Sequence, residues 1–571
     1  MNFDFKTNST TIKGLFKKYG QFQIPVFQRA YTWEPYYYKI FLNDIVNSID
    51  SEDNRENNYF LGTMVFNGDE NDNKISVVDG QQRLTVITII FSAISKRLKE
   101  INEDQLSKAT FRYVQDENDN GDLINHLKSD NSFPFIESFI QSLNNSRASE
   151  PNTEEELLLK KTYEYFFNTF SMEKITKDRD QYVKELINIR NQILNSRVIE
   201  ILTYNKSNAY KIFEILNAKG KSLASIDLIK NIIFESFYNN KNNYESVAKG
   251  YWSDIQKNLR DRNQNIGLAT FYRQYWLSKY NKVPKSKLYD AFKKEFKDSK
   301  NIDKKYIKFL KNLVAESKQF IQILSPSMND YQNRNQYLPV VQKLKTLNNT
   351  LPNTQYTVIV LSLMYAKRND LINLSDLIKA LTFIEDFIFM YTSMGKGQAN
   401  IYESRFSKIA ISLRGSKSKH EAKNILEEQL YNGFNDRIID YKTFESNFIK
   451  LSYTKKSRKE NLLSKYVARR ISNFYDSKNY YLPNSSIEHI IPESTNNDEI
   501  ENIGNIILIE KEINDKCKDK EYIEKKKEYE KSNYEQVKNF VKDYKNFNNE
   551  EIKERAKKLS LIFYNKIIKN K

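Results

Sequence analysis

The sequence of 571 residues holds one cysteine, Cys517, and three histidines. A single cysteine excludes an intrachain disulfide and a metal site built from several cysteines, and it suits a reducing compartment. The longest apolar stretches, such as residues 84–94, contain Thr and Ser and fall short of the ~20 residues that a membrane span needs. Residues 1–15 lack the apolar centre of a signal peptide. We therefore expect a cytoplasmic protein without a membrane segment.

Basic residues outnumber acidic ones. Lysine and arginine total 90 and aspartate and glutamate total 73, and the difference is a formal charge of +17. Such an excess favours a polyanionic partner such as nucleic acid. The chain is also rich in Lys, Asn, Ile and Tyr and poor in Gly and Ala, a bias typical of an AT-rich genome, so the charge alone decides little.

Hydrophobic patterning predicts three regions of different character. The first mixes short β-like runs with helices, which indicates an α+β domain. The second is almost wholly helical, and the third contains a basic helix, a histidine segment and a charged helical tail. The predicted domains are therefore residues 1–235, 236–450 and 451–571. Within them we expect strands at 23–31, 59–68, 74–80 and 197–205, and helices at 33–45, at 84–101 and from about Ser225.

The segment IEHIIPE, Ile487 to Glu493, concentrates reactive groups in a chain that has few histidines. Glu488 precedes His489 directly, and Asn505 and Asn514 follow downstream. Phosphodiester hydrolysis needs a base to activate water and a cation to neutralise the charge that grows on the phosphate. Imidazole suits the base, and carboxylate and amide oxygens suit Mg²⁺ or Mn²⁺. A strand–turn–strand–helix unit would bring His489, Asn505 and Asn514 together, with Glu488 and Asn514 as metal ligands. His489 alone, beside two isoleucines, also fits an ordinary core residue.

A second cluster follows a predicted strand in VVDGQQRLT, Val77 to Thr85. Asp79 ends the strand, Gly80 permits a tight turn, and a helix should begin at about Leu84. A helix N-terminus favours phosphate, and the guanidinium of Arg83 adds donors that match phosphate oxygens. An Asp-Gly hairpin turn followed by a solvated helix cap fits this segment equally well. The sequence AKGKS, Ala218 to Ser222, is not a P-loop, because the required earlier glycine is replaced by Ile215.

A basic helix is predicted at residues 457–472, immediately before the histidine segment. Its cations could follow a DNA backbone and give salt-dependent affinity without sequence preference. An ordinary solvated helix face explains the same pattern. The candidate DNA-binding residues are Lys455, Lys456, Arg458, Lys459, Arg469 and Arg470.

The motifs resemble those of one family. Glu488-His489 with Pro492, Ile503-Gly504-Asn505 and Asn514 resemble the HNH (ββα-metal) nuclease domain of GmrSD-like type IV restriction enzymes. The segments QRAYTW, FLGTMV, DGQQRLT and IFEILNAKGKSLASIDLIKN resemble the ParB/sulfiredoxin-like N-terminal domain of the same enzymes. The resemblance implies that His489 is the general base, that Asn505 braces its strand, and that Glu488 and Asn514 hold the metal. It also implies a site that binds and hydrolyses a nucleoside triphosphate. Asn217 and Gly220 would lie near this site. Its lining would consist of Gln28, Arg29, Asp79, Gly80, Gln81, Gln82 and Arg83.

We therefore expect an NTP-regulated, modification-dependent DNA endonuclease of bacterial anti-phage defence, acting on modified double-stranded phage DNA. The sequence leaves open which nucleotide is used, whether GTP, UTP, CTP or ATP. It also leaves open which DNA modification is sensed and whether the protein forms a homodimer. One alternative is a DNA-modification sensor with little or no nuclease activity. Another is an NTPase switch that recruits a partner effector.

Overall fold

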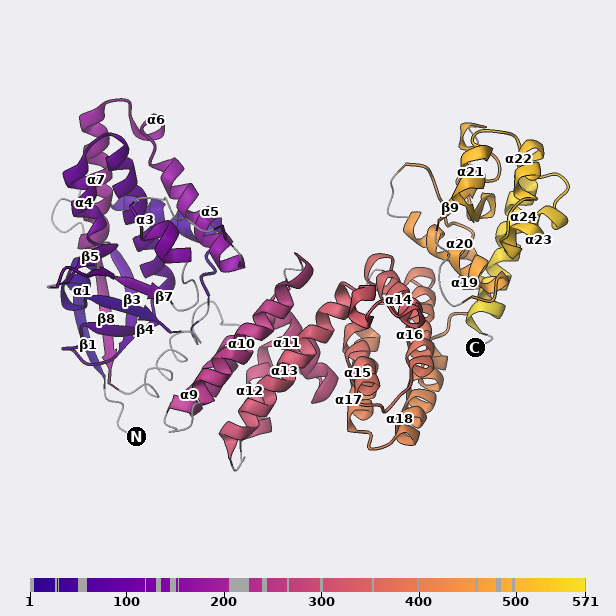
Figure 1. Cartoon of the computed structure of the whole chain (residues 1–571), viewed down its shortest axis with the longest axis horizontal. Coiled ribbons are helices and arrows are strands. Elements are labelled where there is room, and N and C mark those ends of the chain that lie inside the picture. Colours follow the sequence, from indigo (N-terminus) through magenta and orange to yellow (C-terminus); the bar gives the residue numbers. More distant parts are fainter. Residues whose placement is uncertain are drawn as a thin grey trace. The chain divides into compact units, whose positions relative to one another are not determined.

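The computed structural model describes residues 5–25, 28, 30–49, 59–118, 120–129, 135–143, 150–151, 153–204, 225–238, 244–263, 266–297, 301–351, 354–398, 400–456, 461–478, 484–495 and 499–569. The chain divides into two compact units. The first comprises Met1–Ser253 and Ser286–Lys311, and the second comprises Asp254–Lys285 and Asn312–Lys571. This division follows compactness, so the borders of the three predicted domains stay a prediction. Figure 1 colours both units along the sequence.

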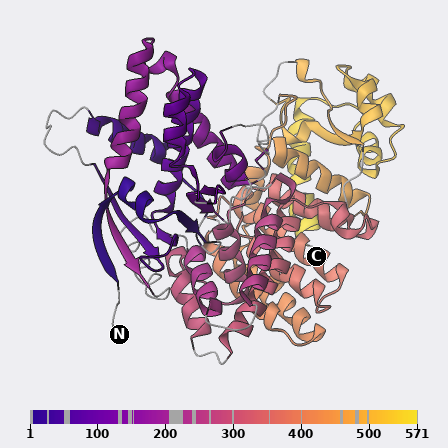
Figure 2. The same ribbon diagram turned by 60° about the vertical axis from the view of Figure 1, so that its left-hand side comes forward.

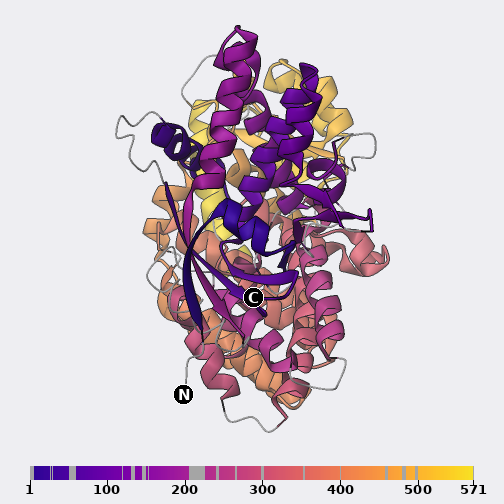
Figure 3. The ribbon, with the colours of Figure 1, turned by 90° about the vertical axis from the view of Figure 1, so that its left-hand side faces the viewer.

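The first unit is built on a mixed six-stranded sheet with the order β1-β8-β3-β4-β2-β7. β3 pairs with β8 in parallel and with β4 in antiparallel register, while β2 runs parallel to both β4 and β7. Figure 3 shows these strands curving beside the helices of the same unit. The strands are β1 (Lys6–Thr11), β2 (Gln21–Ile24), β3 (Phe60–Asn67), β4 (Lys74–Asp79), β7 (Leu127–Ser129) and β8 (Arg197–Thr203), with a separate hairpin of β5 (Gln115–Glu117) and β6 (Leu123–Asn125).

The central helix of this unit is α3 (Gln81–Glu100), which is buried along nearly its whole length. Apolar residues occur on all of its faces, as expected for a helix enclosed by other elements. It packs against α4 (Asp104–Phe111), α5 (Glu154–Thr169) and α7 (Arg179–Asn195), and Figures 1 and 2 show these helices gathered together. The remaining helices are α1 (Ile12–Lys18), α2 (Pro35–Ile49), α6 (Met172–Ile175), α9 (Ser225–Tyr238), α10 (Tyr244–Arg260) and α12 (Leu288–Phe296).

The predicted strands at 59–68, 74–80 and 197–205 and the helices at 33–45, at 84–101 and from Ser225 are confirmed. Three boundaries differ. The helix predicted at 33–45 runs from Pro35 to Ile49. The strand predicted at 23–31 ends at Ile24, because Pro25 has no backbone N–H for a sheet. The helix predicted from Leu84 begins at Gln81, directly after the left-handed residue Gly80.

Helices dominate the second unit. Its larger helices are α11 (Leu268–Lys279), α13 (Ile302–Leu324), α14 (Leu338–Asn349), α15 (Thr357–Arg368), α16 (Leu374–Ile388), α17 (Asn400–Gly415), α18 (Lys419–Ile425), α19 (Tyr441–Phe448) and α20 (Asn461–Tyr475). This confirms the helical region predicted before residue 450. Among the described residues, every helix is too short or too polar to cross a membrane.

The histidine segment folds as a strand hairpin followed by helices. β9 (Ser485–His489) pairs antiparallel with β10 (Ile506–Glu510), and α21 (Lys511–Cys517) follows β10 directly. The predicted order of strand, turn, strand and helix is confirmed. A buried core that includes Ile490, Ile507 and Tyr529 joins the hairpin to the helices after it. These helices are α22 (Tyr522–Tyr529), α23 (Glu535–Asp543), α24 (Asn549–Ile562) and the π-helix η11 (Phe563–Ile568).

Candidate functional site

His489 occupies the last position of β9 and is 3% exposed. Its Nε2 atom lies 3.0 Å from the backbone oxygen of Tyr453. A carbonyl oxygen only accepts hydrogen bonds, so Nε2 carries the proton and the lone pair of the neutral ring lies on Nδ1. Burial lowers the pKa of His489, which keeps the ring neutral at pH 7. The chain therefore holds a buried imidazole in one tautomer, which is the state that a general base needs.

The carbonyl of Tyr453 is itself fixed by the segment that carries it. The Tyr453 N–H donates to the oxygen of Glu501 at 2.7 Å, and the Ile503 N–H donates to Leu451 at 2.9 Å. Glu493, four residues after His489, accepts hydrogen bonds from the Lys455 N–H and the Thr454 hydroxyl. No local pattern predicts that this segment, 36 residues before His489, orients its ring.

Asn505 is fully buried at the start of β10. Its Oδ1 accepts the Ile491 N–H at 2.8 Å, and its Nδ2 donates to the oxygens of Ile491 and Ile500 at 2.9 and 2.8 Å. All of these partners are backbone groups, and Ile491 lies two residues after His489. The side chain thus holds the turn that follows the histidine strand, in line with the bracing role that the family resemblance implies.

Glu488 is 5% exposed and pairs with a buried lysine. The Nζ atom of Lys525, on α22, lies 2.6 Å from Oε1 of Glu488 and 2.6 Å from the backbone oxygen of His489. Burial raises the pKa of Glu488, and the Lys525 ammonium opposes this shift. Lys525 is not among the site residues predicted from the sequence, because no local pattern links it to Glu488, which lies 37 residues earlier.

Asn514, on α21, is the second predicted metal ligand. Its Nδ2 donates to Ser486 Oγ at 2.8 Å and to the oxygen of Ile487 at 3.0 Å, so the side chain ties α21 to β9. These bonds use both amide hydrogens and leave Oδ1 as an acceptor. Carboxylate and amide oxygens are ligand types that Mg²⁺ accepts, since it takes few protein ligands and keeps several waters, so metal binding by Glu488 and Asn514 stays a prediction. Within the described residues, no group of three or more His, Cys, Asp or Glu side chains could hold a metal ion.

The DGQQR segment joins β4 to α3. Gly80 has φ of 99°, a left-handed conformation, and a Cβ there would lie 2.9 Å from the side chain of Met64. Only glycine adopts this backbone without strain. The sharp turn brings the N-terminus of α3 directly behind Asp79, as the sequence predicted.

Gln82 accepts the Thr32 N–H at 2.9 Å and donates to the backbone oxygen of Ala30 at 3.1 Å, and so fixes the QRAYTW segment.

Arg83 binds the protein rather than projecting into solvent. Its guanidinium donates to the oxygens of Leu61 and Thr63 on β3 at 2.7 and 2.6 Å and lies 3.3 Å from Oδ2 of Asp79. Its side chain is 20% exposed. Phosphate binding by Arg83 therefore stays a prediction that requires some of these donors to change partner.

Gln28 reaches the same region, because its Nε2 donates to the oxygen of Val78, next to Asp79. The backbone oxygen of Gln28 accepts a hydrogen bond from Nζ of Lys230 on α9 at 3.3 Å. Burial lowers the pKa of Lys230 to about 8. Lys230 lies in the IDLIKN part of the family motif, which was the signal that could have identified it. Arg29, Asn217 and Gly220 lie outside the described residues.

The basic helix divides into exposed and buried parts. Lys455 and Lys456 are exposed, Arg469 is half-buried, and Arg458 and Lys459 lie outside the described residues. Arg470 is 7% exposed and lies 2.7 Å from Asp386 and 3.3 Å from Glu385 of α16. This ion pairing holds Arg470 inside the protein rather than on the exposed face of the helix, and DNA binding by the basic helix stays a prediction.

Comparison with known families matches both ends of the chain to one kind of enzyme. The N-terminal domain of the GmrSD restriction endonucleases matches residues 12–234, which contain the DGQQR turn and most of α9. The C-terminal domain of the same enzymes matches residues 438–561, which contain β9, β10 and α21. The two matches define a restriction endonuclease, whose substrate is DNA. The chain belongs to the GmrSD family of restriction endonucleases, so the family predicted from the sequence is confirmed. A search among curated proteins finds no match.

Proposed function

We propose that this restriction endonuclease cleaves modified phage DNA with His489 as the general base and one divalent metal, under the control of a nucleoside triphosphate. The proposed nuclease mechanism rests on the 3.0 Å contact between His489 Nε2 and the Tyr453 oxygen. It turns the basic nitrogen Nδ1 away from the carbonyl and makes it available to deprotonate water.

Glu488 and Asn514 would hold the metal, Mg²⁺ or Mn²⁺. When bound, the ion would neutralise charge on the scissile phosphate. The chain's own residues do the remaining work. Asn505 keeps the turn after β9 in place, Lys525 fixes both Glu488 and the backbone of His489, and the buried ring of His489 takes the proton from water. The ββα order of β9, β10 and α21 supports an HNH nuclease domain.

The regulatory half rests on the turn at Gly80. The positive end of the α3 dipole favours a phosphate, and Asp79 and Arg83 lie at the same end of the helix. Gln28, Gln81 and Gln82 would complete the pocket, and the ParB/sulfiredoxin-like domain would sense DNA together with the nucleotide.

The test is cleavage of phage DNA that carries glucosylated hydroxymethylcytosine, methylcytosine or phosphorothioate, with and without Mg²⁺ and each nucleotide. We expect cleavage of one modified substrate, loss of cleavage with EDTA, and a change in rate with one nucleotide. Hydrolysis of that nucleotide should be lost in Asp79→Ala and in Arg83→Ala.

Two results would remove parts of the proposal. Unchanged nucleotide turnover in both N-terminal variants would exclude the pocket at Gly80. Nucleotide hydrolysis without cleavage of any DNA would favour the alternative, a switch that recruits a partner effector.

A further inference from the structure

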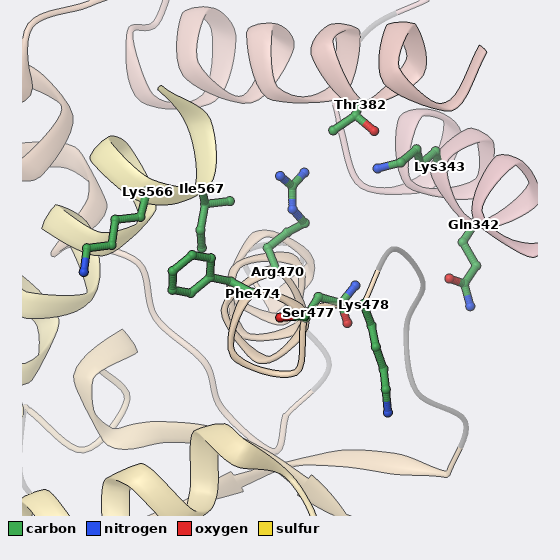
Figure 4. Close-up of a pocket in the computed structure, with 10 residues that line it drawn as sticks. Gln342, Lys343, Thr382, Arg470, Phe474, Ser477, Lys478, Lys566 and Ile567 are labelled. Atoms are coloured by element: carbon green, nitrogen blue, oxygen red, sulfur yellow. The ribbon is translucent and has the colours of Figure 1, made fainter. Parts of the chain in front are cut away.

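A cavity of about 380 Å³ lies in the second unit between α14, α16, α20 and η11. Figure 4 shows it between these helices, with Lys343 and Arg470 pointing into the space, while the side chains of Lys478 and Lys566 start at its edge and extend away from it. Its volume falls in the range of small-molecule sites, which is roughly 300–1,000 Å³. Arg470 is the one lining residue that the sequence also marks as a DNA-binding candidate, and the others lie outside the predicted nuclease and nucleotide sites.

The lining is cationic. Lys343, Arg470, Lys478 and Lys566 contribute four positive charges, and the lining contains no carboxylate. Glu385 and Asp386 lie behind Arg470 and offset part of this charge. The distances are 3.1 Å from Lys343 to Glu385 and 2.7 Å from Arg470 to Asp386.

The positive charges of Lys478 and Lys566 are not offset by the two buried carboxylates. Both are exposed, and neither is ion-paired with a carboxylate in the described part of the chain. Two buried carboxylates against four cations leave a local charge of about +2, which attracts an anion.

Polar groups in the wall add hydrogen-bonding capacity. Asn473 is 8% exposed, lines the cavity, and has an amide oxygen with no hydrogen-bond partner among the described residues. A buried amide oxygen without a partner is costly, and a ligand that carries a hydroxyl or amine group could satisfy it. The hydroxyl of Ser477 lies in the same wall.

We propose that this cavity binds the phosphate group of a phosphorylated ligand. Arg470 and Lys343, held by the two buried carboxylates, would form its preordered floor, and Lys478 and Lys566 would close over the phosphate from the rim. α20 packs against β10 of the nuclease hairpin, so an occupied site would fix α20 against α14 and α16. The phosphate could belong to a free nucleotide or to a nucleic-acid backbone.

The test is hydrogen–deuterium exchange of the full-length protein, with tripolyphosphate as the probe. We expect tripolyphosphate to slow exchange at residues 461–478 and 563–569 in the wild type. In Lys478→Gln/Lys566→Gln, which leaves the buried ion pairs intact, the concentration needed for half-maximal protection should rise about tenfold or more.

The matched control is Lys345→Gln/Lys557→Gln, which removes two exposed lysines of α14 and α24 that do not line the cavity. It should behave like the wild type. Absence of protection in the wild type, or equal weakening in both double variants, would overturn the proposal. A short DNA duplex that competes with tripolyphosphate would identify nucleic acid as the source of the phosphate, and a duplex without effect would identify a free phosphorylated ligand.

Discussion

Lys525 and Glu488 form a buried ion pair next to the predicted base, with Nζ of Lys525 2.6 Å from Oε1 of Glu488. The same ammonium reaches the backbone oxygen of His489, so α22 holds the end of β9 at two points. Burial of both side chains makes each dependent on the other, because an unpaired charge inside a protein is strongly unfavourable.

This pair predicts a large coupling energy. Lys525→Met should lower the free energy of unfolding by about 3–5 kcal/mol, because it leaves Glu488 buried without its partner. Glu488→Gln alone should also destabilise the protein. The double variant Glu488→Gln/Lys525→Met should be more stable than Lys525→Met. Urea unfolding of the four proteins measures the coupling, and additive effects of the two substitutions would contradict the pair.

Gly504 marks a close approach between α24 and the hairpin. A Cβ on Gly504 would lie 2.0 Å from the backbone oxygen of Ile552, and Arg555 donates to the oxygens of Gly504 and Ile506 at 2.6 and 2.9 Å. Gly504→Ala should therefore displace α24 and lower the stability by about 1–3 kcal/mol.

Gly250→Ala is the control for this substitution. Gly250 lies within α10 with open space around its Cβ position, so alanine there should stabilise the helix by about 0.5–1 kcal/mol. Thermal unfolding of both variants provides the comparison. Equal melting temperatures for Gly504→Ala and the wild type would show that α24 does not pack on Gly504 as described.

Lys230 predicts a dependence of stability on pH. Burial lowers its pKa to about 8 in the folded protein from the ordinary lysine value of 10.5. Between pH 8 and 10.5 the unfolded chain binds more protons than the folded protein, so folding becomes more favourable as the pH rises. Below pH 8 Lys230 is protonated in both states, and its unfavourable contribution to stability is constant. Relative to Lys230→Met, the wild type should gain about 2 kcal/mol of stability between pH 7.5 and 9.5. If the difference in the free energy of unfolding between the two proteins stays constant across this range, Lys230 is exposed to solvent rather than buried.

The local elements could be predicted because their causes are local. Gly80 ends a β-branched run and starts α3, and the spacing of Glu488, Asn505 and Asn514 fixes the strand–strand–helix order. The partners of these elements could not be predicted. β3 lies beside β8, more than 130 residues later in the chain, and no local pattern encodes that pairing.

The same limit applied to the candidate sites. Residue types identified His489 and Glu488, but not the Tyr453 oxygen or the Lys525 ammonium that hold them. Arg470 shows the converse, since its neighbours in sequence suggested a DNA-binding face and its neighbours in space are Glu385 and Asp386. Long-range contacts therefore decide which partners surround a charged side chain.

The most direct measurement is cleavage of modified phage DNA by His489→Ala beside His420→Ala. His420 is an exposed histidine on α18, so its loss controls for the removal of an imidazole. We expect His420→Ala to cut like the wild type and His489→Ala to lose cleavage by about 10²–10⁴-fold, the usual contribution of a general base, with its fold intact by circular dichroism. Equal cleavage by a folded His489→Ala would contradict the account.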